Sequence, residues 1–315
     1  MNNIHFIINP QAKNGYSMKV WEKIEKELIS KQLPYRAALT EYRGHAVEMV
    51  EAIHRDLGPK EKVMIVAIGG DGTIHEVING AAHAENVMIG FIPAGSGNDF
   101  RRGYGIPKDP LTALQFILEQ AKAPPLLVDV GEIESRKGKN TNFINNMGVG
   151  FDALITKEAN SSCLKGILNR FHLGSLVYAY FVIKKLFSFK CSNVNISIDG
   201  KKLHYKKAWF VTVSNQPFYG GGMKISPKAK VRDGLLNVTV VHNLSRIKFL
   251  LVFITVFWGG HTRFKEVEEL IGRQISIQSS SSFYAHADGE YIGETPLQIK
   301  VNHQVMPILT KKVDC

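Results

Sequence analysis

Apolar residues in the first 130 positions alternate between short continuous runs and segments with helical spacing. The runs at Ile4–Ile8, Val63–Ile68 and Val87–Ile92 are almost entirely apolar, as strands buried on both faces of a parallel sheet are. Apolar positions three or four residues apart mark helices between them, and a further strand is expected at Tyr35–Leu39. The helices are expected over 17–31, 45–55, 74–81 and 110–121. This order predicts a doubly wound α/β domain.

The pattern changes after Pro124-Pro125. Two short strand-like runs meet at Asp199-Gly200, which is typical of a hairpin turn. Further short runs predict a mainly antiparallel β domain, with strands at Leu235–Val241, Gln274–Gln278, Phe283–Ala287, Leu297–Val301 and Met306–Leu309. Two helices interrupt it, one within 163–189 and one over 246–258 that Ser245 can cap. The second is apolar nearly all round, so it is either buried or faces an apolar partner.

Charge is distributed unevenly along the chain. The formal net charge is +11, yet residues 1–130 carry 14 basic against 15 acidic side chains and residues 131–315 carry 25 against 13. Such a basic half is typical of a surface that meets an anion, and a solvated face without a partner is the alternative. No recognised nucleic-acid-reading motif accompanies it, so we expect no nucleic acid partner.

Cysteine content and hydropathy restrict the cellular setting. Three cysteines, Cys163, Cys191 and Cys315, suit no disulfide or zinc framework and fit a reducing compartment. No signal peptide is evident, and the most apolar segment, Phe249–Trp258, is too short to span a bilayer. We therefore expect a cytoplasmic protein, peripheral if it meets a membrane.

The first candidate for chemistry is Gly69-Gly70-Asp71-Gly72-Thr73, between a predicted strand and a predicted helix. Glycines allow the backbone to approach a phosphate closely, and the start of the helix directs N–H groups at it. Asp71 would repel the phosphate unless a cation lay between them, which suggests Mg²⁺. A tight turn without a ligand is the alternative.

A second glycine-rich segment, Pro93–Phe100, follows the next predicted strand and contains Asp99. Both segments are then expected at the carboxyl edge of the sheet, where open α/β sheets bind ligands. The chain contains no GxxxxGK[ST] sequence, which excludes a P-loop enzyme.

These segments together resemble the diacylglycerol kinase catalytic domain family, which is related to sphingosine and ceramide kinases. The resemblance runs nearly end to end through Asn9-Pro10 with Gly15, Thr40, Gly69–Thr73, Ser96 with Asp99, Asn146–Ala153, Val231–Leu236 and Ala287–Glu290. It implies an NAD-kinase-like nucleotide-binding domain over 1–130, completed by strands at about 302–315, and a β-sandwich lipid-substrate domain over 131–301.

The resemblance also implies roles for individual residues. ATP would be bound by Asn9, Pro10, Gln11, Ala12, Thr40, Gly69, Gly70, Asp71, Gly72, Thr73, Ile74, His75, Glu76, Ser96 and Asn98. Asp71, Asp99 and Asp233 would form a water-linked network to Mg²⁺. A structural Mg²⁺ would be held at Lys230, Asp233 and Leu235, with Lys230 and Leu235 using their carbonyl oxygens. Asp288 or Glu290 would accept the proton of the lipid hydroxyl, and His286 is the neighbouring histidine most worth testing.

Three positions depart from the family pattern. Lys13 stands where relatives usually have glycine, His75 where they often have asparagine, and Ser96 where threonine is common. The first two could change nucleotide affinity, whereas the third keeps a hydroxyl. An ordinary Asp-Gly turn is the alternative for both Asp233 and Asp288.

The expected activity is transfer of the γ-phosphate of ATP to a lipid hydroxyl, most simply that of diacylglycerol, at an anionic membrane surface. A sphingoid base or polyprenol would also fit as acceptor. An NAD kinase would explain Gly69–Thr73 but neither Pro93–Phe100 nor Asp288–Glu290. A non-catalytic lipid- or nucleotide-binding relative is a third interpretation, and the sequence leaves a homodimer open.

Overall fold

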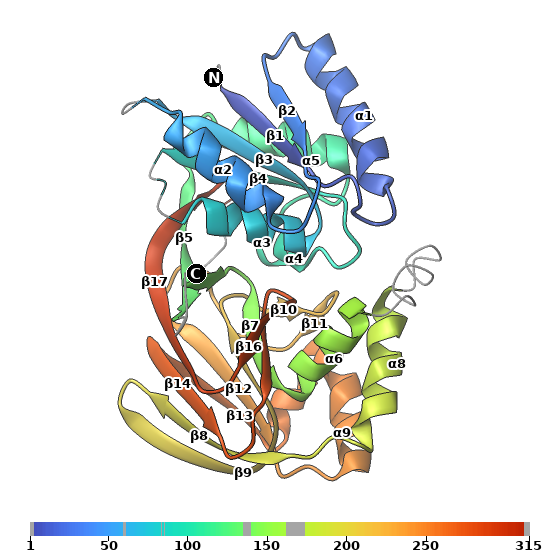
Figure 1. The fold of residues 1–315 in the computed structure, drawn as a ribbon, viewed down its shortest axis with the longest axis vertical. Helices are drawn as coiled ribbons and strands as arrows, with labels where there is room; N and C mark the ends of the chain where they lie inside the picture. Colours follow the sequence, from blue (N-terminus) through green and yellow to red (C-terminus); the bar gives the residue numbers. More distant parts are fainter. Residues whose placement is uncertain are drawn as a thin grey trace. The chain divides into compact units, whose positions relative to one another are not determined.

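The computed structural model describes residues 3–58, 61–82, 84, 86–134, 140–161 and 174–311. The chain divides into two compact units, Met1–Val128 with Gln304–Asp314, and Asp129–His303. Figure 1 shows the elements of both units. Parts of the apolar segment predicted as a helix over 163–189, and Cys163 and Cys315, lie outside the described residues.

The first unit is the predicted doubly wound α/β domain. Its parallel strands lie in the order β4-β3-β1-β2, and the end of β17 pairs with β4 through Ile308 and Ile89. Helices α1 and α5 contact each other, as do α2 and α3, and the two pairs cover the sheet (Figure 1). The bounds are β1 Ile4–Ile8, α1 Tyr16–Ser30, β2 Arg36–Leu39, α2 His45–Arg55, β3 Val63–Gly69, α3 Asp71–Gly80, β4 Val87–Pro93, α4 Asp99–Gly103 and α5 Pro110–Gln120.

Burial in this sheet follows the apolar runs. Every residue of β3 is buried, as its continuous apolar sequence predicts for a central parallel strand. All four residues of β2 are exposed, because β2 is the edge strand beyond β1. A loop follows the carboxyl end of each of the strands β1, β3 and β4 and leads into α1, α3 and α4, respectively.

The second unit is a mainly antiparallel β sandwich. The long strand β9 pairs with β8 along its first half and with both β7 and β12 along its second half, so it joins these strands into one continuous sheet. The bounds are β5 Leu126–Ile133, β6 Thr141–Phe143, β7 Asn146–Gly150, β8 Ser192–Ile198, β9 Lys201–Ser214, β10 Phe218–Tyr219, β11 Met223–Lys224, β12 Leu236–His242, β13 Val267–Gly272, β14 Gln274–Ser279, β15 Tyr284–Ala287, β16 Glu290–Glu294 and β17 Leu297–Ile308.

Helices α6, α8 and α9 also belong to the second unit. The helix predicted over 246–258 is present as α9, Arg246–Thr255, followed by the 3₁₀ turn η1, Val256–Trp258. Ser245 caps it, since its side chain accepts the N–H of Lys248, and Gly259 ends it in the left-handed conformation. Helices α6 and α8 span Phe151–Ser161 and Gly174–Leu186, and a second 3₁₀ turn, η2, spans Gly260–Arg263. None of the described helices combines the length and the apolar character needed to cross a membrane.

One strand prediction was wrong. Leu297–Val301 and Met306–Leu309 were expected as two strands, because the polar residues 302–304 interrupt the apolar pattern. The structure joins them in the single strand β17. Gln304 has a positive φ of 51°, and this local irregularity lies where β17 leaves the second unit for the first.

Candidate active site

The turn between β3 and α3 is built from Gly69–Thr73. Gly70 precedes α3 in an extended conformation, and Asp71 is the first residue of the helix. A Cβ atom on Gly69 would overlap the Thr73 hydroxyl, so only glycine fits there. The first turn of α3 therefore presents its N–H groups at the carboxyl end of β3, an arrangement that suits an anion.

The second glycine-rich loop packs directly on the first. A Cβ atom on Gly95 would overlap the Cα atom of Gly70, and the Ala94 N–H donates to the Gly69 carbonyl at 2.7 Å. Asn98 closes this loop, since its side chain accepts the Gly95 N–H at 3.1 Å and donates to the Gly95 carbonyl at 2.9 Å. The two loops thus form one surface, as their positions after neighbouring strands predicted.

Two carboxylates lie where these loops meet. Asp71 Oδ1 accepts the N–H of Phe100 at 3.0 Å, which brings it next to the loop that carries Asp99. Asp99 is buried and pairs with Arg102, whose Nη1 lies 2.9 Å from Oδ1 and also contacts the Gly97 carbonyl. Two carboxylates therefore lie close to this pair of loops, and Arg102 pairs with one of them, Asp99.

The loop after β1 reaches the same place. Asn9 donates from Nδ2 to the Thr73 hydroxyl at 3.2 Å and accepts the Gln11 N–H at 3.0 Å. Lys13, Asn14 and Gly15 follow with φ of 48°, 53° and 84°. A left-handed conformation costs a non-glycine residue about 1–2 kcal/mol, which gives a physical reason to expect glycine at the position of Lys13.

The other residues predicted to surround ATP take different positions in the first unit. Glu76 accepts the N–H groups of Gly44 at 2.9 Å and Ala46 at 3.2 Å, so its carboxylate stabilises the start of α2. Ile74 is fully buried, and His75 is nearly so. Thr40 is buried at the end of β2, where its N–H donates to the Ile8 carbonyl at 2.8 Å. Pro10 and Ala12 belong to the loop after β1, Gly72 lies in the first turn of α3, and Ser96 is exposed in the second loop.

In the second unit, Asp233 lies near a carboxylate that sequence reasoning missed. Asp129 is fully buried, accepts the Gly234 N–H at 2.7 Å and contacts His303 Nδ1 at 2.7 Å. Asp233 is exposed at the surface, so its carboxylate is only partly desolvated. This partial desolvation and the charge of Asp129 raise the pKa of Asp233 above its ordinary value, whereas the Leu235 N–H and the charge of Lys230 lower it. A nearby cation would relieve both unfavourable effects.

The donor set around Asp233 fits a hard cation only in part. No three His, Cys, Asp or Glu side chains converge on one point anywhere in the described ranges. Mg²⁺ in proteins commonly keeps several waters and takes one or two carboxylates, so Asp233 with the backbone carbonyls of Lys230 and Leu235 remains a suitable set. The family resemblance implied these three residues, and their role as ligands stays a prediction.

Asp288 and Gly289 form the two-residue turn between β15 and β16. Their φ angles of 49° and 88° are those of a type I′ turn, for which Asp-Gly is a favoured pair. The Asp288 carboxylate is buried and accepts three backbone N–H groups, from Ile144 at 3.0 Å, Asn145 at 2.9 Å and Asn146 at 3.0 Å. Asp288 therefore fixes this turn to the start of β7, and Glu290 follows it, partly exposed.

Each of the two units matches a known protein family. Residues 3–132 match the diacylglycerol kinase catalytic domain, and residues 145–310 match the YegS C-terminal NAD kinase beta sandwich-like domain. These matches confirm the predicted fold class.

Relatives with known names agree with the two domain matches. The chain is 33% identical over 312 residues to a Bacillus subtilis (strain 168) protein named "Putative lipid kinase YtlR", covering 98% of this chain and all of that one. It is 29% identical over 318 residues to the diacylglycerol kinase of the same strain, covering 98% and 97% of the two chains. A crystal structure of a diacylglycerol kinase from Bacillus anthracis str. Sterne has the same fold, with a TM-score of 0.72, 21% identity and coverage of 99% and 97%.

The resemblance expected from the ordered glycine-rich and acidic segments is therefore confirmed. It covers both units, and the loops that carried it lie at the carboxyl ends of β1, β3 and β4. The chain belongs to the diacylglycerol kinase family of lipid kinases.

Proposed function

We propose that this protein transfers the γ-phosphate of ATP to the hydroxyl of diacylglycerol, which yields phosphatidic acid. The observation that carries the proposal is the contact between Gly70 and Gly95, because it joins two N–H-rich loops and two carboxylates into one surface. Phosphoryl transfer requires positioning and charge neutralisation more than covalent chemistry, and this surface offers both.

The loops after β1, β3 and β4 would hold the ATP phosphates against the start of α3. When bound, Mg²⁺ would neutralise the charge on the transferring phosphate, with Asp71 and Asp99 of the first unit holding its water ligands. Asp233 of the second unit, with the carbonyl oxygens of Lys230 and Leu235, would hold a structural Mg²⁺. The proton of the lipid hydroxyl would pass to the carboxylate pair of the β15–β16 turn, Asp288 or Glu290, as the hydroxyl oxygen attacks phosphorus and ADP departs.

The assay is transfer of labelled γ-phosphate from ATP to a panel of acceptors: diacylglycerol, sphingosine, ceramide, a polyprenol and NAD. We expect label in phosphatidic acid. Label in another lipid would keep the enzyme class and change the acceptor. Label in NADP would support the NAD kinase alternative, and nucleotide binding without transfer to any acceptor would support a non-catalytic protein.

The metal role of Asp233 predicts a specific thermal shift. The pKa of Asp233 is raised in the folded protein, so folding disfavours the ionised carboxylate. The stability of the folded protein therefore falls as pH rises from the ordinary pKa of an aspartate through the raised pKa of Asp233. Mg²⁺ should raise the unfolding midpoint of the wild type at neutral pH. Asp233→Asn should lose this response while remaining at least as stable as the wild type in EDTA. A full Mg²⁺ response in the variant would contradict the assignment.

Exposed apolar side chains on α9 and η1 support binding to a membrane. Ile247, Leu251, Ile254 and Trp258 are 75%, 61%, 56% and 63% exposed and recur at helical spacing. Arg246 at the start of α9 donates to the Leu186 carbonyl, which holds the end of α8 beside it. The neighbouring part of α8 adds the exposed residues Tyr180 and Ile183 and the basic residue Lys184, and Phe187 is exposed directly after the helix. Lys185 pairs with Glu158. Apolar side chains beside basic ones are typical of proteins that bind anionic bilayers.

Co-sedimentation with vesicles tests this surface. We expect binding to vesicles that contain anionic lipid, weakened by salt, and a loss of about tenfold in Leu251→Ser with Trp258→Ser, because burial of both side chains is lost. Ile29→Ser is the matched control, since Ile29 is 62% exposed on α1 of the first unit. Equal binding of the control and the α9 variant would contradict the assignment.

A further inference from the structure

His286 is a buried histidine just before the Asp-Gly turn that carries the proposed base, and the proposed mechanism gives it no role. It lies in β15, and the pairing of β15 with β16 changes register beside it. Ala285 lies opposite Gly293, whereas His286 lies opposite Tyr291, so Ile292 is an extra residue of β16. Bulges of this kind redirect neighbouring side chains and are common next to active sites. The place of His286 therefore suits a residue that acts on the turn.

One ring nitrogen of His286 contacts the turn itself. Nδ1 accepts the N–H of Gly289, the second residue of the turn, at 3.3 Å. The first residue, Asp288, is held from its own side chain by the three N–H groups of residues 144–146. His286 and Asp288 thus fix the two residues of the turn separately. Because Nδ1 acts as an acceptor, the ring hydrogen of the neutral imidazole lies on Nε2.

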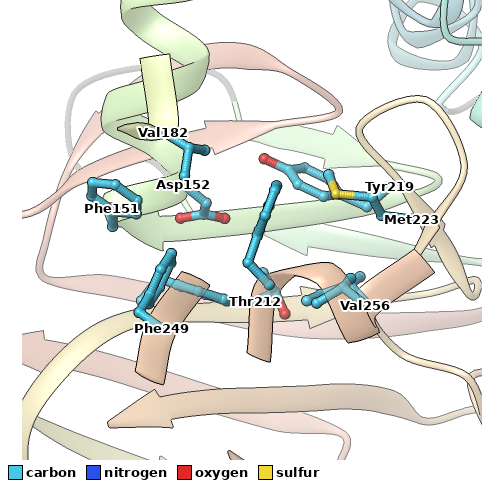
Figure 2. A pocket seen from close by; sticks show the side chains of 11 residues that line it. Phe151, Asp152, Val182, Thr212, Tyr219, Met223, Phe249 and Val256 are labelled. Carbon is cyan, nitrogen blue, oxygen red and sulfur yellow. The ribbon is translucent and has the colours of Figure 1, made fainter. Parts of the chain in front are cut away.

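The other ring nitrogen of His286 faces a buried carboxylate. Nε2 lies 3.4 Å from Asp152 Oδ2 and 3.5 Å from the Tyr219 hydroxyl. The Tyr219 ring also stacks on the imidazole, with 5.6 Å between the ring centroids. Asp152 and Tyr219 line the apolar pocket that Figure 2 shows. A buried negative charge favours a hydrogen on the nitrogen that faces it, so Asp152 stabilises the tautomer that the turn requires.

Glycine at position 148 makes room for the approach of Asp152 to His286. Gly148 of β7 pairs with His286 of β15. A Cβ atom on Gly148 would overlap both Asp152 Oδ2 and His286 Nε2. Asp152 Oδ1 accepts the Ala153 N–H at 2.7 Å, which fixes the carboxylate at the start of α6. The chain of contacts from Asp152 through His286 to Gly289 is therefore built by α6, β7 and β15 together.

We propose that His286 is a positioning residue for phosphate transfer. Asp152 keeps the imidazole in its Nε2–H tautomer, and Nδ1 then holds Gly289, so that Asp288 and Glu290 keep the orientation in which one of them accepts the proton. This role rests on the proposed kinase activity and adds a residue that acts through the turn without contact to substrate. A displacement of the base by about 1 Å can lower a rate about 100-fold, so a small movement of the turn is sufficient.

Two amide variants separate the roles of the two ring nitrogens. The side-chain oxygen of asparagine can take the place of Nδ1, whereas the side-chain amide of glutamine reaches the place of Nε2. His286→Asn should therefore keep the acceptor for the Gly289 N–H, and His286→Gln should lose it. We expect kcat for lipid phosphorylation to fall about tenfold in His286→Gln and to stay close to the wild-type value in His286→Asn. The KM for ATP should be unchanged in both.

Hydrogen exchange tests the contact with the turn without any need for turnover. Amide exchange of the segment 286–290 is followed by mass spectrometry in the full-length protein without ATP or lipid. We expect faster exchange in His286→Gln than in the wild type, and the wild-type rate in His286→Asn, because only the glutamine variant leaves the Gly289 N–H without this acceptor.

The ¹⁵N chemical shifts of the imidazole report the tautomer of His286 directly. The signals of His286 are assigned by their loss in His286→Gln. We expect the Nε2–H tautomer in the wild type. Asp152→Asn removes the negative charge that faces Nε2, so the Nδ1–H tautomer should appear and exchange of the segment 286–290 should become faster.

His261→Gln is the matched control. His261 is a second fully buried histidine of the second unit, and its Nε2 lies 3.0 Å from the Ile225 carbonyl oxygen. Glutamine keeps a donor at that place, so neither kcat nor the exchange of 286–290 should change. Equal loss of kcat in His261→Gln and His286→Gln would overturn the specific role of His286.

The remaining outcomes separate the positioning role from the proposed function. Equal exchange of 286–290 in the wild type and His286→Gln, or an Nδ1–H tautomer in the wild type, would overturn the contact. An equal loss of kcat in His286→Asn and His286→Gln would overturn the role of Nδ1. Faster exchange in His286→Gln with an unchanged kcat would overturn the positioning role. If the wild type transfers phosphate to no acceptor, the proposed function fails, and the exchange and tautomer results still decide whether His286 holds the turn.

Discussion

Replacing Asp71 by asparagine should lower the rate of phosphate transfer to diacylglycerol by about 100- to 1,000-fold. Asp71 begins α3, and its Oδ1 accepts the Phe100 N–H. An asparagine carbonyl oxygen can accept the same bond, so the contact between the loops should survive while the negative charge is lost. The measurement is the initial rate at saturating ATP and lipid, with the unfolding midpoint as the check on folding.

Asp56→Asn is the matched control for Asp71→Asn. Asp56 is exposed at the end of α2, so the same chemical change there should leave both the rate and the unfolding midpoint unchanged. Full activity in Asp71→Asn would refute the metal role assigned to this carboxylate. A loss of activity together with unfolding would show instead that Asp71 is mainly structural.

Replacing Asp288 by asparagine should destabilise the second unit by about 2–3 kcal/mol and also reduce activity. The buried carboxylate accepts three backbone N–H groups from residues 144–146. An asparagine side chain has one acceptor oxygen, and its amide nitrogen would face an N–H group left without a partner. Denaturant unfolding followed by circular dichroism measures the loss.

Asp199 offers a close comparison for Asp288. It also precedes glycine in a two-residue hairpin turn and accepts the N–H groups of Arg273 and Gln274, but it lies at the surface. Asp199→Asn should therefore cost less than about 1 kcal/mol, since solvent can satisfy the freed groups. Equal losses of stability in Asp288→Asn and Asp199→Asn would contradict the explanation that burial makes the Asp288 carboxylate costly to replace.

Glu290→Gln separates the two candidates for the base. Glu290 is partly exposed after the turn, so this variant should fold as the wild type does. If Glu290 accepts the proton, the rate falls while stability is unchanged. If the rate is unchanged, Asp288 is the base as well as the anchor of the turn.

The sequence predicted the first unit well, because local and long-range signals agree there. The apolar runs of β3 and β4 are buried as such runs should be, and His45–Arg55 is a helix with the predicted bounds. Gly69–Thr73 and Pro93–Phe100 were expected at one edge of the sheet, and the overlap that any Cβ on Gly95 would have with Gly70 shows how closely they meet. Parallel topology makes such proximity predictable.

The second unit was less predictable, for reasons that particular residues illustrate. Asp129 lies in the strand β5 with no motif around it, and only tertiary contacts place it near Asp233. Asp152 belongs to a segment that resembled the family, yet no sequence pattern shows that its carboxylate lies buried at an apolar pocket, 3.4 Å from His286 Nε2. The family resemblance implied a place for Glu76 near ATP, which stays a prediction, and no sequence pattern shows that its carboxylate accepts N–H groups at the start of α2.

The central claim is that the surface formed by the two glycine-rich loops transfers phosphate from ATP to a lipid hydroxyl. The most direct measurement is the identity of the labelled product when the full-length protein, γ-labelled ATP, Mg²⁺ and anionic vesicles containing diacylglycerol are combined. The account predicts labelled phosphatidic acid from the wild type, at least 100-fold less from Asp71→Asn, and none when diacylglycerol is omitted. Release of labelled inorganic phosphate without any labelled lipid, or equal product from Asp71→Asn, would contradict it.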